Sequence, residues 1–386
     1  MGYGMFDVKS KIHISAGLPC TSVLPFPDII KIISNDLNKE NDPEILQYGF
    51  SRGYLRFREI LARFINDREQ RIIDPNSLFI TNGATHGILL SIIALSKGKA
   101  SIIVERPTYF PLLDLFKELN LDVYFADVDE CGISTDSIRK QLKSITSGTT
   151  FIHCTPYFQN PTGVCINKDK ANELMDIVNS NPNTWLLSDN VYKYLNFSIE
   201  KDLNLFTLDQ CERFIQISSF SKIFGPGLRV GWLEATESII KTIEESGYVQ
   251  SSGGFNPFVC RSIEHILETG MIHKIIDGWI TFLKTKQKSL VADLRTIFPE
   301  AEFIVPRGGY YIWVNLKNDL IGNSKFREFV KNKKDLVYVP GTKCAGNMDL
   351  YKSYTRLGFA TYKEDELAVG LRKLKESFEE FNHVSL

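Results

Sequence analysis

The chain has 386 residues, of which 43% are hydrophobic and 24% are charged, and its 45 basic and 46 acidic side chains give a formal net charge of −1. This composition is ordinary for a globular protein, and the length predicts two domains because single cores stop growing at about 250 to 300 residues. The near-neutral charge gives no support to nucleic-acid or membrane-surface binding, so local groups would have to hold an anionic small ligand.

The seven cysteines are scattered and form no CxxC pair. We therefore expect reduced thiols, with neither disulfides nor a bound metal. The first residues lack the apolar run of a secretory signal, and no apolar stretch of about 18 residues suggests a membrane span. These features predict a cytoplasmic protein.

Short apolar runs alternate with helix-like stretches through the middle of the chain. Such alternation predicts an α/β fold with a mainly parallel sheet and helices on both of its faces. The expected strands are 78–81, 101–104, 123–126, 151–154, 185–187 and 214–217, and the expected helices are 87–95, 111–119 and 168–178.

The last third of the chain has a different pattern. The periodic stretch 273–298 predicts one long helix, and 363–381 predicts a terminal amphipathic helix. Four short apolar runs between them indicate an α+β unit, so we predict a large domain over 41–280 and a small domain formed by 1–40 and 281–386. The four runs are 303–305, 310–314, 336–339 and 353–357.

Functional groups of α/β sheets gather at the carboxyl ends of strands. Five predicted strands here are followed by polar, glycine or aromatic residues, which we expect to converge on one cleft. These segments are 82–85, 107–109, 157–163, 189–192 and 218–222.

Lys222 follows the predicted strand 214–217 and stands close to Ser219 and Ser221. Lysine is rarely buried unless it is paired or used, and burial or nearby cations lower its pKa, as a Schiff-base lysine requires. Arg229 lies seven residues further on and could clamp a phosphate with two hydrogen bonds. The alternative is a solvated lysine on a loop.

Asp189 ends the predicted strand 185–187. A buried carboxylate needs a cationic partner, and a protonated pyridine nitrogen is one such partner. Tyr192 follows three residues later and could reach the same ligand. The alternative is that Asp189 caps a helix and Tyr192 is a packing residue.

Four further features each allow two interpretations. Segment 82–87 passes from a strand into a helix, whose first amide groups could bind an anion. Asn160 opens an Asn-Pro-Thr-Gly segment that could be a simple turn. Tyr109 could stack on a planar ring or pack in the core. Arg356, within the strand-like run 353–357, needs an anion, either a substrate carboxylate or a structural ion-pair partner.

Together and in this order, these motifs resemble the class I and II aminotransferases, which are fold-type-I enzymes that depend on pyridoxal 5′-phosphate (PLP). Segments 227–232 and 47–56 are similar to the 2-aminoadipate and kynurenine aminotransferase branch, and the resemblance to the family runs from about Gly17 to the C-terminus. It implies a large domain with a mainly parallel seven-stranded sheet flanked by helices, and a smaller α+β domain.

The resemblance also implies roles for individual residues. Lys222 would form a Schiff base with PLP and move the substrate proton. Asp189 would pair with the pyridinium nitrogen and keep the ring an electron sink. Tyr192 and Asn160 would hydrogen-bond the phenolate oxygen, and Tyr109 would stack on the ring.

Arg356 would bind the α-carboxylate of the substrate, together with Asn160 and the backbone near Gly17. Tyr48 would reach the phosphate of the other subunit, so that the active sites of a homodimer are shared across its interface. Gly83 and the next residue replace the usual hydroxyl of the phosphate loop, which would then depend on backbone amides. The implied phosphate ligands in the same subunit are Gly83, Ala84, Thr85, Ser219, Ser221 and Arg229.

These roles predict ping-pong transfer of an amino group from an L-amino acid to a 2-oxo acid, with 2-oxoglutarate as the expected acceptor. A PLP-dependent C–S β-lyase and a catalytically degenerate or regulatory PLP-binding protein are the alternatives. The amino donor stays open, because segment 17–22, which often shapes the side-chain pocket in this family, is short here and lacks the usual acidic residue. A further hypothesis places 252–254 at the partner's cleft.

Overall fold

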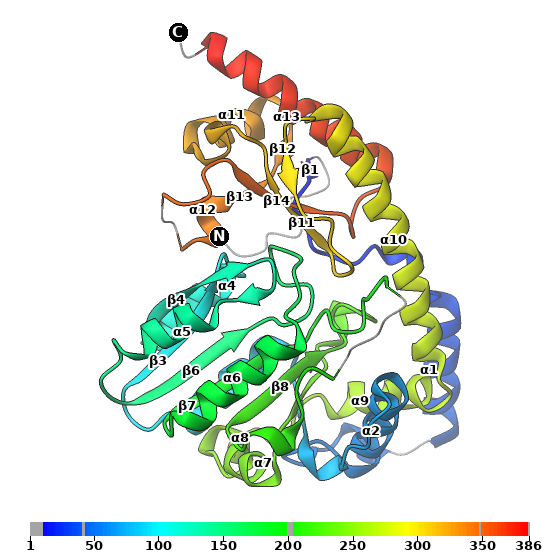
Figure 1. Ribbon diagram of the computed structural model, residues 1–386. Coiled ribbons are helices and arrows are strands. Elements are labelled where there is room, and N and C mark those ends of the chain that lie inside the picture. Colours follow the sequence, from blue (N-terminus) through cyan, green and yellow to red (C-terminus); the bar gives the residue numbers. More distant parts are fainter. Residues whose placement is uncertain (1–10, 41–42, 199–203, 347–348, 385–386) are drawn as a thin grey trace.

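The computed structural model describes residues 11–40, 43–198, 204–346 and 349–384 (Figure 1). The outermost parts of the predicted small domain, 1–10 and 385–386, lie outside these residues. Among the described helices, none is both long enough and apolar enough to cross a membrane.

The described part of the chain forms an eight-stranded sheet in the order β2-β9-β8-β7-β6-β3-β4-β5. Strands β8, β7, β6, β3 and β4 run parallel, whereas β9 is antiparallel to both of its neighbours. The mainly parallel seven-stranded sheet is thus confirmed, and the two-residue β5 extends it. The strands are β2 (Leu78–Thr81), β3 (Ala100–Arg106), β4 (Asp122–Asp129), β5 (Gly132–Ile133), β6 (Thr149–Cys154), β7 (Thr184–Asp189), β8 (Phe214–Ser219) and β9 (Gly231–Glu234).

Strands β2, β6, β8 and β9 are buried on both faces of this sheet, and successive side chains of a strand point to opposite faces. Ile102 and Val104 of β3 pack with α3, α4 and α7, whereas Ile103 packs with helices on the other face, which include α2, α6 and α9. This explains why the strands are apolar without alternation. The helices are α2 (Leu55–Glu69), α3 (Ala84–Leu95), α4 (Pro111–Glu118), α5 (Thr135–Leu142), α6 (Lys168–Ser180), α7 (Glu237–Glu244), α8 (Gly247–Ser252) and α9 (Pro257–Glu268).

The C-terminal third forms a separate antiparallel sheet in the order β10-β11-β14-β13. The predicted long helix is α10, which packs against both α9 and α13 and so runs along the two halves of the molecule (Figure 1). The elements are α10 (Met271–Ile297), β10 (Glu302–Phe303), β11 (Tyr311–Asn315), α11 (Ser324–Lys333), β12 (Leu336–Val337), β13 (Val339–Pro340), α12 (Gly341–Cys344), β14 (Tyr354–Gly358) and α13 (Glu364–Val384).

The prediction of one strand over 336–339 is wrong. β12 pairs with β1 (Ile12–His13), whereas β13 pairs with β14 in the other sheet. The chain passes from one sheet to the other at Tyr338, because β12 pairs with a strand near the N-terminus and β13 pairs with a strand near the C-terminus.

The N-terminal segment contacts both halves of the molecule. β1 pairs with β12, while α1 (Phe26–Glu40) packs against α9. The division into a large domain of 41–280 and a small domain of 1–40 and 281–386 stays a prediction.

Candidate functional site

Lys222 lies in a turn three residues beyond the end of β8. Its Nζ donates to the Gly17 carbonyl oxygen at 3.0 Å and lies 5.5 Å from the centre of the Tyr310 ring. The Tyr310 hydroxyl donates to the carbonyl oxygen of Lys222 at 2.7 Å. These contacts do not fit a solvated lysine on a loop, because residues from the N-terminal and C-terminal parts of the chain both contact the side chain.

The environment of Lys222 favours the neutral amine. Burial, and then the positive charges of Arg356 and Arg229, lower its pKa from 10.5 to about 8, although Asp189 opposes this change. A buried amine loses hydration of its charged form, which explains the direction. Lys222 therefore has the nucleophilic character that a Schiff-base lysine needs.

Asp189 ends β7, where it pairs with Ile217 of β8. The side chain is buried, its Oδ1 accepts from the Val191 amide at 3.4 Å, and its Oδ2 lies 3.8 Å from Nε2 of His153. The residues that follow form turns, so the alternative of a helix cap is wrong. Since β8 leads directly into the turn of Lys222, the fold places the predicted carboxylate and amine at the same edge of the sheet.

Tyr192 is buried within a group of aromatic rings. Its ring centre lies 5.6 Å from that of Tyr310 and 6.2 Å from that of Tyr311. Gly17 is close to the same group, because an added Cβ there would overlap the Tyr311 hydroxyl. Tyr310 of this group is the ring that lies 5.5 Å from Lys222 Nζ.

An anion cradle forms where Arg229 meets the turn after β2. Its Nη2 donates to the Asn82 carbonyl oxygen at 2.9 Å and its Nη1 to Ser221 Oγ at 3.4 Å, while Ser219 Oγ donates to Ser221 Oγ at 2.9 Å. Gly83 has φ of +92°, and a Cβ added there would lie 2.7 Å from Arg229 Nη2. The approach of the guanidinium to this backbone therefore requires glycine.

Helix α3 begins at the same place. Gly83 is its N-cap and makes no side-chain capping hydrogen bond, so the first amide groups of the helix, at Ala84 and Thr85, have no side-chain acceptor from the cap. Such amides bind anions, helped by the helix dipole. With Arg229 and two serine hydroxyls, this donor set fits a phosphate group.

Arg356 lies on β14 and is buried. Its Nη1 donates to Asn160 Oδ1 at 2.9 Å, its Nη2 donates to the Ser15 carbonyl oxygen at 3.0 Å, and the guanidinium lies 4.2 Å from the centre of the Tyr311 ring. These neighbours fix a planar donor group close enough to Lys222 to lower its pKa. Arg356 and Asn160 thus belong to the same site as Lys222.

The last two predicted residues are Tyr109 and Tyr48. Tyr109 stands between β3 and α4, where it packs against the core on that face. The side chain of Tyr48 is 88% exposed. The stacking of Tyr109 and the contact of Tyr48 with a second subunit therefore stay predictions.

The sequence patterns did not predict that the surroundings of the site include Tyr310, Tyr311, Ser15, His153 and Glu105. Glu105 is buried in β3, where its carboxylate accepts from the Thr155 amide at 3.1 Å, and burial raises its pKa to about 8. Its position within an apolar run was a usable signal, because buried glutamates are rare. Neither ring nitrogen of His153 has a hydrogen-bond partner among the described residues.

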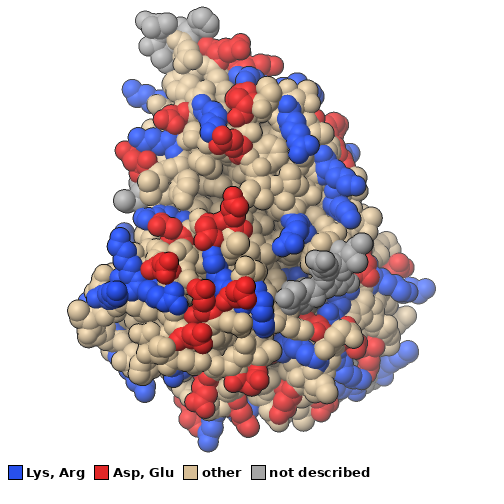
Figure 2. Space-filling view, in the orientation of Figure 1, with Lys and Arg blue, Asp and Glu red and all other residues tan. Residues whose placement is uncertain are grey.

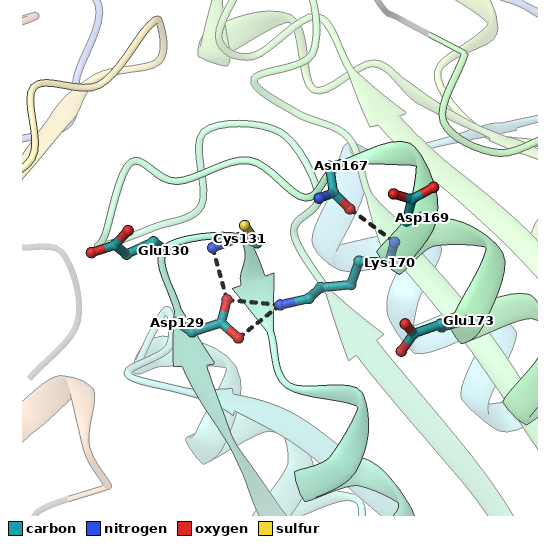
Figure 3. A pocket seen from close by; sticks show the side chains of 7 residues that line it. All are labelled: Asp129, Glu130, Cys131, Asn167, Asp169, Lys170 and Glu173. Atoms are coloured by element: carbon teal, nitrogen blue, oxygen red, sulfur yellow. Dashed lines mark hydrogen bonds and ion pairs between the residues drawn. The ribbon is translucent and has the colours of Figure 1, made fainter.

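A shallow hollow of about 460 Å³ lies elsewhere on the surface (Figure 3). Its lining contains none of the predicted site residues, and Lys170 Nζ binds Asp129 there at 2.7 and 2.9 Å. The described residues contain no group of acidic, histidine or cysteine side chains that could hold a metal ion. On the face drawn in Figure 2, basic and acidic side chains are interspersed, so an anion depends on the local cradle.

Comparison with known proteins gives one family. The protein-family model "Aminotransferase class I and II" matches residues 9–374 of the chain. The chain is 25% identical over 383 residues to aromatic-amino-acid aminotransferase 1 of Thermococcus litoralis, covering 97% of this chain and 90% of that protein. It is 26% identical over 374 residues to the HTH-type transcriptional regulator NorG of Staphylococcus aureus, covering 95% of this chain and 80% of NorG.

A solved structure of similar fold is Pyrococcus horikoshii kynurenine aminotransferase in complex with PMP, with KYN as substrate and KYA as product. It superposes with a TM-score of 0.84 at 27% identity, covering 97% of this chain and 92% of that one. The architecture described above is therefore that of these proteins.

Proposed function

The chain belongs to the class I and II aminotransferase family, and from this premise we propose that it moves an amino group from an L-amino acid to a 2-oxo acid, with 2-oxoglutarate as acceptor. PLP-dependent transamination is the chemistry of the family. The observation that supports this proposal best is that Asp189 and Arg356 share the surroundings of Lys222. Asp189 pairs with Ile217 of the strand that leads to Lys222. Arg356 lies against the Tyr311 ring, which borders Gly17, the hydrogen-bond partner of Lys222.

The residues present fit PLP. Lys222 would hold its aldehyde carbon and Asp189 its pyridine nitrogen, while Arg229, the serines and the first turn of α3 would hold its phosphate. When bound, PLP supplies an electron sink for the electrons of the Cα–H bond.

Once the substrate amino group has replaced Lys222 on the aldehyde carbon, the free Nζ would take the proton from the substrate Cα and deliver it to the cofactor. A base works best when its pKa lies near the operating pH, and the lowered pKa of Lys222 provides this. Asp189 would pair with the ring nitrogen of the cofactor. Tyr192 is also buried, so its side chain would help to exclude water. Its hydroxyl would donate a hydrogen bond to the phenolate oxygen of PLP.

Arg356 would bind the α-carboxylate of the substrate. Asn160, Ser15 and the Tyr311 ring already orient its guanidinium, so less conformational entropy is lost on binding. A carboxylate held by two hydrogen bonds is stabilised, which favours loss of the Cα proton over decarboxylation.

We further propose an aromatic amino donor. The rings of Tyr192, Tyr310 and Tyr311 form one group, with ring centres 5.6 to 6.4 Å apart. The centre of the Tyr310 ring lies 5.5 Å from Lys222 Nζ. Such rings favour an apolar or aromatic side chain through offset or edge-to-face contacts. A relative named for aromatic amino acids and a neighbour named for kynurenine support the same choice.

Family members are typically dimeric, and we propose a homodimer with shared active sites. Large apolar side chains are exposed around Tyr48, including Leu46 at 76%, Phe50 at 71% and Phe258 at 44%. Residues 46–50 and 257–258 are neighbours, because a Cβ added at Gly49 would contact Pro257 at 3.1 Å. A contiguous apolar surface of this kind is typical of a protein interface.

A panel of amino donors with 2-oxoglutarate tests the function, with the keto acid read by mass spectrometry. Aromatic donors should give product, Lys222→Ala should give none, and Lys170→Ala should behave like the wild type because Lys170 binds Asp129 on the surface. Pyruvate release from a cysteine conjugate without an acceptor would support a β-lyase instead. A purified protein that lacks visible absorbance and binds no PLP would support a degenerate member.

A further inference from the structure

The turn after α8 packs against the segment that carries Tyr48. Gly253 and Gly254 have φ of +70° and +85°, in the region that favours glycine. A Cβ added at Gly253 would overlap Cδ1 of the Tyr48 ring and lie 3.0 Å from its Cγ, and one added at Gly254 would lie 2.6 Å from the Phe50 carbonyl oxygen. Glycine is therefore required here by both conformation and space.

The same turn continues to the anion cradle of its own subunit. Asn256 has φ of +50°, and its Nδ2 donates to the carbonyl oxygen of Arg229. The ring of Phe255 lies 4.5 Å from that of His86, in the first turns of α3. Four consecutive residues thus contact Tyr48 at one end and Arg229 and α3 at the other.

We propose that residues 253–256 are a positioning element shared by the two active sites of the dimer. Gly253 fixes Tyr48 for the cofactor phosphate of the partner subunit, and Asn256 fixes Arg229 for the phosphate of its own subunit. The inference rests on the proposed function, which gives Tyr48 and Arg229 these phosphate roles.

Exposure of Tyr48 makes such a device necessary. In the isolated subunit Tyr48 is 88% exposed, so its side chain has rotamer freedom that it would lose in the partner's site, and this loss would weaken phosphate binding. Contact with Gly253 restricts the ring before the phosphate arrives. A methyl group at position 253 would displace the Tyr48 ring. The variant would still have the Tyr48 hydroxyl, so only the position of this group would change.

Hybrid dimers separate this role from a general effect on folding. One subunit carries Lys222→Ala, so borohydride can trap PLP on Lys222 of the other subunit alone. Gly253→Ala is placed either on the Lys222→Ala subunit (trans) or on the subunit with Lys222 (cis). Both hybrids contain one altered turn, so a loss of stability affects them equally. The measurement is the PLP concentration that half-saturates trapping, read by mass spectrometry.

In trans, Gly253→Ala should raise the half-saturating PLP concentration about tenfold, which corresponds to loss of one hydrogen bond to a charged group. In cis, the concentration should stay near that of the parent hybrid. Asn256→Gly keeps the left-handed conformation and should show the reverse pattern, with its effect in cis. Gly247→Ala on α8 is the matched control in trans, because an added Cβ there has nothing within 4 Å.

Equal shifts in cis and trans, or no shift in either, would overturn the role of Gly253. Tyr48→Phe in the same hybrids tests the premise separately. If Tyr48→Phe acts in trans and Gly253→Ala does not, the inference alone fails. If Tyr48→Phe also has no effect in trans, the phosphate role given to Tyr48 in the proposed function fails as well.

Discussion

Replacing Asp189 with asparagine removes a charge while the shape of the side chain is kept. Asp189 is buried at the end of β7, and the hydrogen bond that its Oδ1 accepts from the Val191 amide is long, at 3.4 Å. Asparagine can keep that contact through its carbonyl oxygen. We therefore expect Asp189→Asn to fold and to bind PLP, with the main effect on the chemical step.

The size of that effect follows from the charge that is lost. Two opposite unit charges at about 4 Å interact by about 4 kcal/mol at an effective dielectric constant of about 20. Removal of one preorganised partner from a developing charge typically costs about 3 to 4 kcal/mol. This range predicts a loss of about 10² to 10³ in kcat, since about 1.4 kcal/mol corresponds to a factor of ten.

The assay is steady-state transamination of an aromatic donor with 2-oxoglutarate, at saturating PLP. Asp127→Asn is the matched control, because the side chain of Asp127 is 66% exposed and pairs with Arg106 at 3.0 Å, and such surface pairs contribute little. It should change kcat less than twofold. A loss below tenfold for Asp189→Asn in a folded, PLP-loaded protein would refute the reasoning.

Three further predictions concern the pKa of Lys222, the carboxylate clamp and the buried ionic network. Because the pKa of Lys222 is lowered to about 8 and the neutral amine is the nucleophile, the rate at which apoprotein captures PLP should rise as pH increases through about 8; stopped-flow absorbance checks this, and a rise centred at the ordinary lysine pKa would contradict it. Arg356→Lys should raise KM for the amino donor about tenfold or more, because lysine cannot make two parallel hydrogen bonds, and a KM unchanged within twofold would exclude the clamp. Glu69→Gln should lower the free energy of unfolding by about 3 to 5 kcal/mol in urea, because Glu69 is buried with Lys193 at 2.8 Å and Arg71 at 2.6 Å; a loss below about 1 kcal/mol would show that the network adds little.

Much of the large domain could be predicted because its strands are buried on both faces. Strand β2 begins and ends where the sequence predicts, and α10 differs from its prediction by only a few residues. The antiparallel β9 and the division of 336–339 into β12 and β13 could not be predicted, because both depend on pairing with distant segments.

The residues of the site also divide into those that the sequence could predict and those that it could not. Lys222 and Asp189 were predictable because each follows a strongly apolar strand, and the carboxyl ends of neighbouring parallel strands meet. Tyr311 and Ser15 contact Arg356 only through the packing of the small sheet and the N-terminal segment. No local pattern of spacing reports such contacts.

Covalent trapping tests directly whether Lys222 is the residue that carries PLP. The holoprotein is reduced with borohydride and digested, and the peptide that carries the pyridoxyl group is identified by mass spectrometry. We expect a single modified residue, Lys222, whose Nζ has the lowered pKa. Modification of another lysine, such as the buried Lys193, or no modification of a PLP-loaded protein, would contradict it.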